Sequence, residues 1–259
     1  MNRIKDYEQL KFDIVRWLKD YYWMHSIKAF VVGVSGGIDS AVVSTLCAET
    51  GLPTYVVCMP LLSTHDNSKL SEDHAKALAD KYDNVTKVFV ELSSVYDQFM
   101  HSVNWWADTQ HFEKDEFTGN ELANANTKSR IRMITLYQIA GSKKGIVVGT
   151  GNKVEDYGIG FYTKYGDGGV DVAPIADLYK TEVWELGKHL GVDERIIDAE
   201  PTDGLWDDDR KDEDQIGASY EQLEEAMEYR RGPALDILDE FYNKNKHKME
   251  PIPTFKLKS

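Results

Sequence analysis

Residues 30–41 read Phe-Val-Val-Gly-Val-Ser-Gly-Gly-Ile-Asp-Ser-Ala, an apolar run that is interrupted by a serine- and glycine-rich turn and then resumes. This order predicts a buried strand, a tight turn and the start of a helix. The glycines let phosphate oxygens approach the main chain, and the first N–H groups of the helix point at a bound anion. Ser35 and Ser40 add hydroxyl donors, whereas Asp39 would repel a phosphate unless a divalent cation lay between them. The stretch therefore predicts a nucleotide phosphate site that also holds Mg2+.

The composition narrows the class of protein. The chain has 259 residues, a formal net charge of -14 and only two cysteines, Cys47 and Cys58, both in apolar segments. The negative charge disfavours nucleic acid and anionic membranes as partners. We expect buried thiols rather than a disulfide framework or a cysteine metal site. The first residues lack the apolar stretch of a signal peptide, and no apolar run is long enough to span a membrane, so we expect a cytoplasmic protein.

Strand-like and helix-like segments alternate along most of the chain. Amphipathic helical spacing covers residues 4–23, and the expected strands are 30–34, 54–60, 87–92 and 145–149, separated by helices at 39–50, 68–82 and 121–140. Apolar strands separated by helices indicate a parallel sheet that is covered on both faces. We therefore expect an α/β, Rossmann-like fold in one domain, 1–259, with a nucleotide-binding core at 28–200. Ligands of such sheets lie at the carboxyl ends of the strands, where the Ser-Gly-Gly turn and Thr150 fall.

Other segments carry weaker patterns. Residues 102–120 are expected to be irregular, and their aromatic side chains could pack on the core or cover a ligand. The segment from Thr150 to Pro174 is long and without a regular pattern, which is typical of functional loops. Residues 202–217 form an acidic stretch that is either a solvated loop or a lid. Helices are expected at 178–190, 219–230 and 233–244, followed by an irregular tail.

The phosphate turn lacks the sequence patterns of P-loop enzymes and of bound dinucleotide cofactors. Ser35-Gly-Gly-Ile-Asp-Ser40 instead resembles the pyrophosphate loop of the ATP pyrophosphatases, which have an adenine nucleotide alpha hydrolase-like fold. Further segments resemble ammonia-dependent NAD synthetases, namely 126–133, 149–155, 160–171, 174–180, Glu200-Pro-Thr202 and His247-Lys248. This resemblance implies that ATP adenylates the nicotinate carboxylate of nicotinic acid adenine dinucleotide (deamido-NAD). Ammonia would then displace AMP to give NAD, with pyrophosphate as the other product.

The same resemblance implies roles for individual residues. Asp39, Glu155 and Lys180 would be catalytic, with Asp39 and Glu155 as ligands of Mg2+. The implied ATP-binding residues are Gly33, Ser35, Gly36, Gly37, Ile38, Asp39, Ser40, Thr150, Lys180 and Thr202. The implied deamido-NAD-binding residues are Arg130, Tyr137, Lys164, Asp167, Asp171, His247 and Lys248.

Several of these assignments have an alternative. Asp167 could orient the nicotinate or only shape its turn, and His247 with Lys248 could bind a substrate phosphate or form a surface patch. Arg130 and Tyr137 share one helical face, so Arg130 can reach the substrate while Tyr137 packs nearby. In the family the second substrate lies across a two-fold interface, which implies a homodimer. The first helix could contact the partner subunit or only cover the core.

One segment departs from a common form of the family. The chain has Cys58-Met59-Pro60 at the end of the second strand, where Arg-Leu-Pro is expected. We therefore assign no side chain to the adenine ring. The alternatives to an NAD synthetase are another ATP pyrophosphatase that acts on a different small acid, and a non-catalytic ATP-binding sensor of the same fold.

Overall fold

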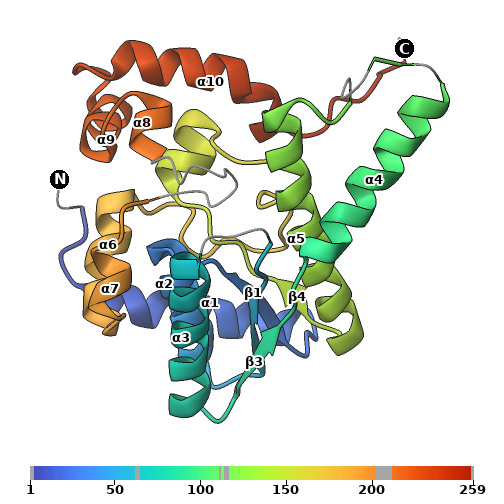
Figure 1. The fold of residues 1–259 in the computed structure, drawn as a ribbon. Coiled ribbons are helices and arrows are strands. Elements are labelled where there is room, and N and C mark those ends of the chain that lie inside the picture. Colours follow the sequence, from blue (N-terminus) through green and yellow to red (C-terminus); the bar gives the residue numbers. More distant parts are fainter. Residues whose placement is uncertain (1–2, 62–64, 111, 114–116, 202–211, 258–259) are drawn as a thin grey trace.

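The computed structural model describes residues 3–61, 65–110, 112–113, 117–201 and 212–257. Its four parallel strands pair in the order β3-β2-β1-β4 (Figure 1). They are β1 (Phe30–Val34), β2 (Thr54–Cys58), β3 (Val85–Phe89) and β4 (Ile146–Val147). The predicted parallel sheet is confirmed, and β1 lies at its centre with the phosphate turn at its carboxyl end.

Helices cover both faces of this sheet. Along β1, Phe30 and Val32 pack into a core that includes α1 (Tyr7–Met24), α2 (Ile38–Glu49) and α6 (Lys180–Leu190). Val31 faces the opposite side, where it packs with Ile131 and Ala140 of α5 (Glu121–Lys143). The helix α3 (His65–Lys81) lies against β2 and β3. The sheet is therefore covered on both faces, as its apolar strands predict.

Helix α2 is the most enclosed helix of the sheet layer. Ten of its twelve residues are buried, because it packs against β1 below and against α1 and α6 at its sides. Gly187 of α6 makes this approach close: a Cβ atom added there would lie 2.6 Å from Ile38 Cδ1. The close contact packs α6 against the first turn of α2, and Lys180 at the start of α6 reaches Asp39 of that turn.

A second hydrophobic core lies over the carboxyl ends of the strands. A π-helical segment, η1 (Lys153–Ile159), packs there with α9 (Tyr220–Tyr229) and α10 (Leu235–Met249). Two short helices, α7 (Glu194–Ile197) and α8 (Asp212–Ile216), lie between α6 and α9 in the sequence. Figure 1 shows α8, α9 and α10 on the side of the sheet to which the strands point. This second core therefore lies over the phosphate turn at the end of β1.

The expectation that residues 102–120 are irregular is wrong for most of their described part. A continuous helix, α4 (Ser93–Thr109), includes Trp105 and Trp106. The side chain of Trp105 is 63% exposed, and Trp106 stacks on Phe112 with the ring centroids 5.6 Å apart. Because these aromatic residues lie on a helix that projects from the sheet (Figure 1), they neither fill the main core nor line the strand-end pocket.

Other expectations were wrong at the boundaries of elements. The segment after Thr150 contains η1 and is therefore not wholly irregular, and residues 212–216 form α8 instead of continuing the acidic loop. Thr202 and the rest of 202–211 lie outside the described residues. The strand expected at 87–92 is β3 at Val85–Phe89, and α10 continues to Met249, so that His247 and Lys248 are helical. Both cysteines are free and buried, as expected. Among the described residues, no helix is both long and apolar enough to cross a membrane.

The buried histidine of α3 makes the stability of the fold depend on pH. His74 Nε2 lies 3.0 Å from Ser44 Oγ of α2, and burial lowers the pKa of His74 to about 4. Between pH 6.5 and 4 the unfolded chain therefore binds a proton that the folded chain does not. We expect His74 to reduce the free energy of unfolding by about 1.4 kcal/mol per unit as the pH falls through this window.

Urea unfolding at pH 7, 6 and 5 tests this expectation. The variant His74→Gln, which does not titrate, should lose less stability between pH 7 and pH 5 than the wild-type chain. His101→Gln, at an exposed position of α4, is the matched control and should keep the wild-type dependence. Equal slopes for the wild type and His74→Gln would show that His74 does not carry this effect.

Candidate active site

A pocket of about 310 Å3 opens at the carboxyl ends of β1, β2 and β4. It brings together most of the residues that were predicted to bind ATP. They are Gly33, Ser35, Gly36, Gly37, Ile38, Asp39, Ser40, Thr150 and Lys180. Glu155 and Asp167 also line it. Parallel strands bind ligands at this edge, so the site lies where the fold places it.

The turn after β1 is held by its own serines. Ser40 Oγ accepts a hydrogen bond from Ser35 N at 3.1 Å and donates one to Gly37 O at 2.9 Å. Gly36 has φ +94°, a conformation that a residue with a side chain rarely adopts. No described side chain caps the start of α2. The first amides of α2 therefore remain donors for an anion in the pocket.

Three charged side chains from three elements meet beside this turn. Lys180 Nζ, at the start of α6, donates to Asp39 Oδ2 of α2 at 2.6 Å and to Glu155 Oε1 of η1 at 2.9 Å. Lys180 is 3% exposed. Such a buried ammonium is stable only beside carboxylates that compensate its lost hydration. The three residues therefore depend on one another for their charged states.

The pKa values reflect this competition between burial and pairing. Burial would lower the pKa of Lys180, but the two carboxylates outweigh it and raise that pKa. Burial raises the pKa of Asp39 in spite of the charge of Lys180. Burial also raises the pKa of Glu155, but the attraction of Lys180 and several hydrogen bonds outweigh it and bring this pKa below its usual value. Lys180 is therefore positive and Glu155 negative near neutral pH.

Asn152 joins two of these elements, and the sequence analysis missed it. Its side chain accepts hydrogen bonds from the backbone N–H groups of Val154 and Glu155, at 3.0 and 3.1 Å, and so caps η1. Its Nδ2 donates to Asp39 Oδ1 at 3.1 Å. One fully buried amide thus connects the segment that carries Glu155 with the helix that carries Asp39. The pattern Asn152-Lys-Val-Glu155 is a capping signal that could have revealed it.

The donor set fits a magnesium ion. Asp39 Oδ2 and Glu155 Oε1 converge on one cation position, which the ammonium of Lys180 takes here. Mg2+ in nucleotide sites is commonly held by one or two carboxylates, with phosphate oxygens and water completing its coordination. Among the described residues, no group of three or more Asp, Glu, His and Cys side chains could hold a metal by itself. The two carboxylates therefore suit an ion that arrives together with a phosphate.

Asp167 is the one predicted acceptor-binding residue that lines the pocket. Its Oδ1 accepts hydrogen bonds from Ser129 Oγ at 2.7 Å and from Thr163 N at 3.0 Å, and its own N–H donates to Ser129 Oγ. These bonds tie the Gly-Asp-Gly-Gly turn to the inner face of α5. They support the turn-shaping role, while one edge of Asp167 still faces the pocket.

The other predicted acceptor residues lie outside this pocket. Arg130 and Tyr137 are on the exposed side of α5, where the Arg130 guanidinium is 3.4 Å from Lys164 O and Tyr137 OH donates to Asp171 Oδ1 at 3.1 Å. Lys164 Nζ donates to the carbonyl of His247 at 3.1 Å.

Lys248 is also bonded to main chain, since its Nζ donates to Tyr162 O at 2.8 Å. None of these six residues lines the pocket. Their roles in binding remain predictions.

Apolar side chains, among them Met59 and Leu136, line the pocket beside the phosphate turn, in the region to which the sequence assigned no contact. A Cβ atom added at Gly33 would lie 3.3 Å from both Met59 Cε and Leu136 Cδ1. Arg132, on the inner face of α5, donates from Nε to the carbonyl of Met59 at 3.3 Å. The absence of a side chain at Gly33 therefore lets Met59 and Leu136 pack directly over the end of β1. Periodicity had indicated α5 but not which of its residues face inward.

Tyr220 of α9 was also missed. Its hydroxyl donates to Glu155 Oε1 at 2.7 Å, although the two residues are 65 positions apart. Burial, together with the charge of Glu155, raises the pKa of Tyr220, which therefore remains a hydrogen-bond donor. No local pattern relates Tyr220 on α9 to the carboxylate of Glu155 on η1.

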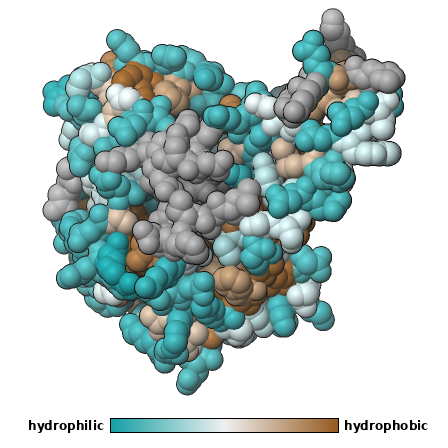
Figure 2. Space-filling model, viewed as in Figure 1, coloured by the Kyte–Doolittle hydropathy of each residue, from teal (hydrophilic) through white to brown (hydrophobic). Residues whose placement is uncertain are grey.

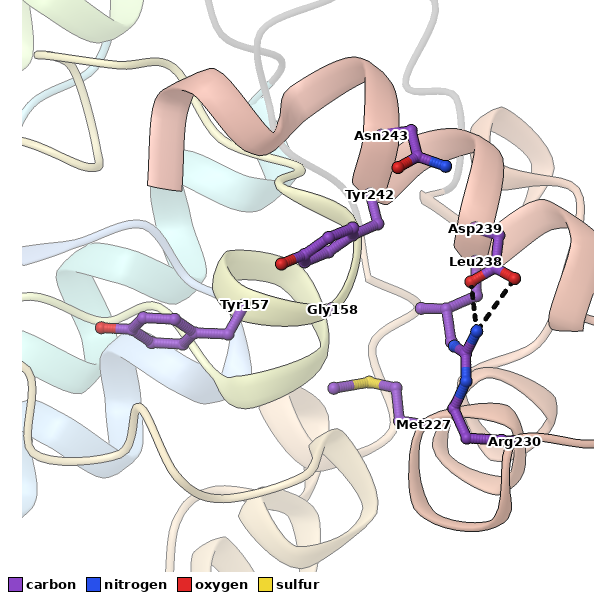
Figure 3. Close-up of a pocket in the computed structure, with 8 residues that line it drawn as sticks. All are labelled: Tyr157, Gly158, Met227, Arg230, Leu238, Asp239, Tyr242 and Asn243. Carbon is purple, nitrogen blue, oxygen red and sulfur yellow. Dashed lines mark hydrogen bonds and ion pairs between the residues drawn. The ribbon is translucent and has the colours of Figure 1, made fainter. Parts of the chain in front are cut away.

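A second cavity, of about 480 Å3, lies between η1, α9 and α10 (Figure 3). Its charged pair is satisfied internally, since Arg230 donates to both carboxylate oxygens of Asp239 at 2.8 and 3.0 Å. Tyr157 and Tyr242 also line it, but none of the predicted site residues does. The strand-end pocket is therefore the candidate active site.

The chain is similar in sequence and fold to known proteins over most of its length. The NAD synthase family profile matches residues 11–253. The NH3-dependent NAD+ synthetase of Finegoldia magna is 34% identical over 252 residues, which cover 96% of this chain and 97% of that protein. The corresponding protein of Alkaliphilus oremlandii is 36% identical over 247 residues, with 93% and 94% covered.

Two solved structures match over nearly the whole chain. The NMN synthetase of Francisella tularensis superposes with a TM-score of 0.87 at 31% identity, covering 98% of this chain and all of that one. The NH3-dependent NAD synthetase of Campylobacter jejuni, in complex with nitrate, gives a TM-score of 0.74 at 25% identity, with the same coverage. Since the family profile, the curated relatives and the fold agree over almost the full length, this chain belongs to the NAD synthase family.

Proposed function

We propose that this protein catalyses the ATP-dependent amidation of deamido-NAD by ammonia, giving NAD, AMP and pyrophosphate. The observation that carries the proposal is the meeting of Lys180, Asp39 and Glu155 beside the Ser-Gly-Gly turn, in a chain of the NAD synthase family. Other ATP pyrophosphatases and ATP-binding sensors are less well supported, because the curated relatives are NH3-dependent NAD synthetases.

In this reaction the phosphate turn holds the group that leaves. The amides at the start of α2, with Ser35 and Ser40, would bind the β- and γ-phosphates of ATP, and Lys180 would neutralise charge near the α-phosphate. Asp39 and Glu155 would hold Mg2+, which supplies further charge neutralisation. Met59 and Leu136, which line the same pocket, would offer an apolar surface to the adenine ring. The nicotinate carboxylate attacks the α-phosphorus, the bond to pyrophosphate breaks, and ammonia then displaces AMP.

The two substrates must also be held in register. The carboxylate and the phosphate that it attacks are both anions, so positioning and neutralisation carry most of the catalysis. We assign the acceptor to a rim formed by Asp167 together with Arg130 and Tyr137 of α5, Lys164 and Asp171 of the loop after η1, and His247 and Lys248 of α10. The turn at Asp167 would then face the nicotinate end of the acceptor.

A second candidate substrate differs only in size. The Francisella tularensis structure with a TM-score of 0.87 is an NMN synthetase, whereas the NAD synthetase of Campylobacter jejuni gives 0.74. Amidation of nicotinic acid mononucleotide would use the same carboxylate chemistry without the adenylyl half of the acceptor. The two candidates therefore share the adenylation site and differ at the rim.

A product assay separates the candidates. The protein is incubated with Mg-ATP, ammonium and either deamido-NAD or nicotinic acid mononucleotide, and NAD, NMN, AMP and pyrophosphate are measured. We expect NAD, with equal amounts of AMP and pyrophosphate, and a higher kcat/KM for deamido-NAD. Glutamine in place of ammonium is the control and should give no product. A higher kcat/KM for the mononucleotide would favour the second candidate, and ADP with inorganic phosphate would contradict both.

The metal assignment predicts the effect of neutralising either carboxylate. We expect Asp39→Asn and Glu155→Gln each to lower the rate of adenylation by about 100-fold or more, because charge stabilisation by a metal is worth several kcal/mol. The binding of Mn2+ in the presence of a non-hydrolysable ATP analogue, measured by electron paramagnetic resonance, should weaken in parallel. Asp177→Asn, at an exposed carboxylate that pairs with Lys153, is the matched control. Wild-type Mn2+ affinity in either site variant would remove that residue from the metal site.

We also propose that the protein is a homodimer that pairs through α4 and the outer face of α5. Both helices carry exposed apolar side chains, namely Val95, Phe99 and Trp105 on α4 and Leu122 and Ile134 on α5. Figure 2 shows that the arm formed by α4 projects from the rest of the surface. Contiguous apolar patches mark interfaces, and we propose that these side chains contribute to one. A partner on this face would also cover Arg130 and Tyr137 at the acceptor rim.

Sedimentation velocity tests the proposed interface. We expect the wild type to sediment as a dimer and Trp105→Glu and Phe99→Glu to sediment as monomers. Trp23→Glu is the matched control, because Trp23 is as exposed, at 65%, but lies on α1. Dissociation by Trp23→Glu alone would place the interface on α1, and a monomeric wild type would refute the dimer.

A further inference from the structure

Tyr220 touches two of the three charged residues of the site. It is fully buried, and its hydroxyl lies 2.7 Å from Glu155 Oε1 and 3.4 Å from Asp212 Oδ2. The centroid of its ring is 5.0 Å from Lys180 Nζ. The hydroxyl thus holds the carboxylate while the ring face attracts the ammonium.

The main chain around Tyr220 is fixed independently of the site. Its N–H donates to Glu213 Oε1 of α8 at 2.9 Å, and the preceding Ser219 forms a capping box with Gln222 at the start of α9. The ring packs edge-on against Trp184 of α6, with the centroids 5.8 Å apart. Because these contacts set its place, Tyr220 can impose an orientation on Glu155 and Lys180 instead of following them.

The carboxylate of Glu155 is the group whose orientation Tyr220 can control. Glu155 Oε1 accepts from both Lys180 Nζ and Tyr220 OH. If ATP binds as proposed, the charge of Lys180 would be shared with phosphate oxygens, and the hydroxyl of Tyr220 would be a neutral donor that still holds Glu155 Oε1. A buried donor in a fixed position costs no reorganisation during the reaction.

We propose that Tyr220 is a positioning residue that orients Glu155 and Lys180 for adenylation. This inference rests on the proposed function, since it concerns the reaction assigned to that site. It also gives the second hydrophobic core a role in catalysis, because α9 supplies the side chain that reaches into the site from above the strand ends.

Tyr179 provides a matched control. It is also buried, at 2% exposure, and its hydroxyl donates to Glu228 Oε2 of α9 at 3.0 Å. Glu228 is not among the residues that line the strand-end pocket. Tyr220→Phe and Tyr179→Phe therefore each remove one hydroxyl that is bonded to a glutamate, and only the first of these glutamates belongs to the site.

The first experiment compares these two variants by steady-state kinetics. We expect Tyr220→Phe to lower kcat by about 10- to 100-fold, the effect of losing a hydrogen bond to a charged group, with KM for the acceptor within about threefold of the wild type. Mn2+ binding in the presence of a non-hydrolysable ATP analogue should weaken as well. Tyr179→Phe should leave kcat and Mn2+ affinity within about threefold of the wild type, whatever it does to the unfolding temperature. Equal kinetics and equal Mn2+ affinity of the two variants would overturn the proposal.

A second experiment keeps the hydroxyl and does not depend on the folding of a variant. With 3-fluorotyrosine at position 220, the fluorine resonance should shift when Mg2+ and the ATP analogue bind, because Glu155 and Lys180 change partners beside the ring. The same label at position 179 should not shift. An unmoved resonance at position 220 would overturn the proposal.

The assays distinguish a failure of the proposed function from a failure of the role proposed for Tyr220. If the wild-type protein forms neither NAD nor NMN, the proposed function fails. If the wild type is active and Tyr220→Phe behaves like Tyr179→Phe, only the role of Tyr220 fails.

Discussion

The structure depends on one buried ammonium shared by two carboxylates. Lys180, Asp39 and Glu155 come from three elements that are far apart in the sequence, and each is costly to bury without the others. The sheet order makes their meeting possible, because β1 and β4 are neighbours and the elements that follow them lie side by side. The contact of Gly187 with Ile38 then brings α6 against α2, and Asn152 joins η1 to Asp39. Packing and hydrogen bonding therefore place the charges before any substrate arrives.

The parts of this arrangement that are local in sequence could be predicted. The apolar run at Phe30–Val34 and the turn after it specify a strand, a phosphate turn and a helix, and the structure has all three. The approach of Asp39, Glu155 and Lys180 also followed from the sequence, through the resemblance to known synthetases. Motifs of this kind work because each residue is fixed by its immediate neighbours, and the parallel sheet then brings the strand ends together.

The missed features have physical reasons. The last turns of α4 carry Trp105 and Trp106 on the surface, where aromatic side chains among polar residues do not mark a face that packs on the core. The π-helical turn η1 has no characteristic period, and Gly158 and Gly160 within the segment suggest a loop. Tyr220 acts through a contact across 65 residues, which only the packing of the second core creates. Sequence patterns report local geometry, whereas these features arise from tertiary packing.

Helix α5 has a mechanical consequence. Its 23 residues form one rod about 34 Å long, which runs from the projecting arm to the sheet. One end carries the exposed Leu122, the middle holds the Asp167 turn through Ser129, and the far end packs on β1 through Ala140. Ile131 and Ala140 both pack in the core on this face of the sheet, so the helix is anchored along its second half. The rod therefore holds the exposed end at Leu122 and the Asp167 turn at a fixed separation from each other and from β1.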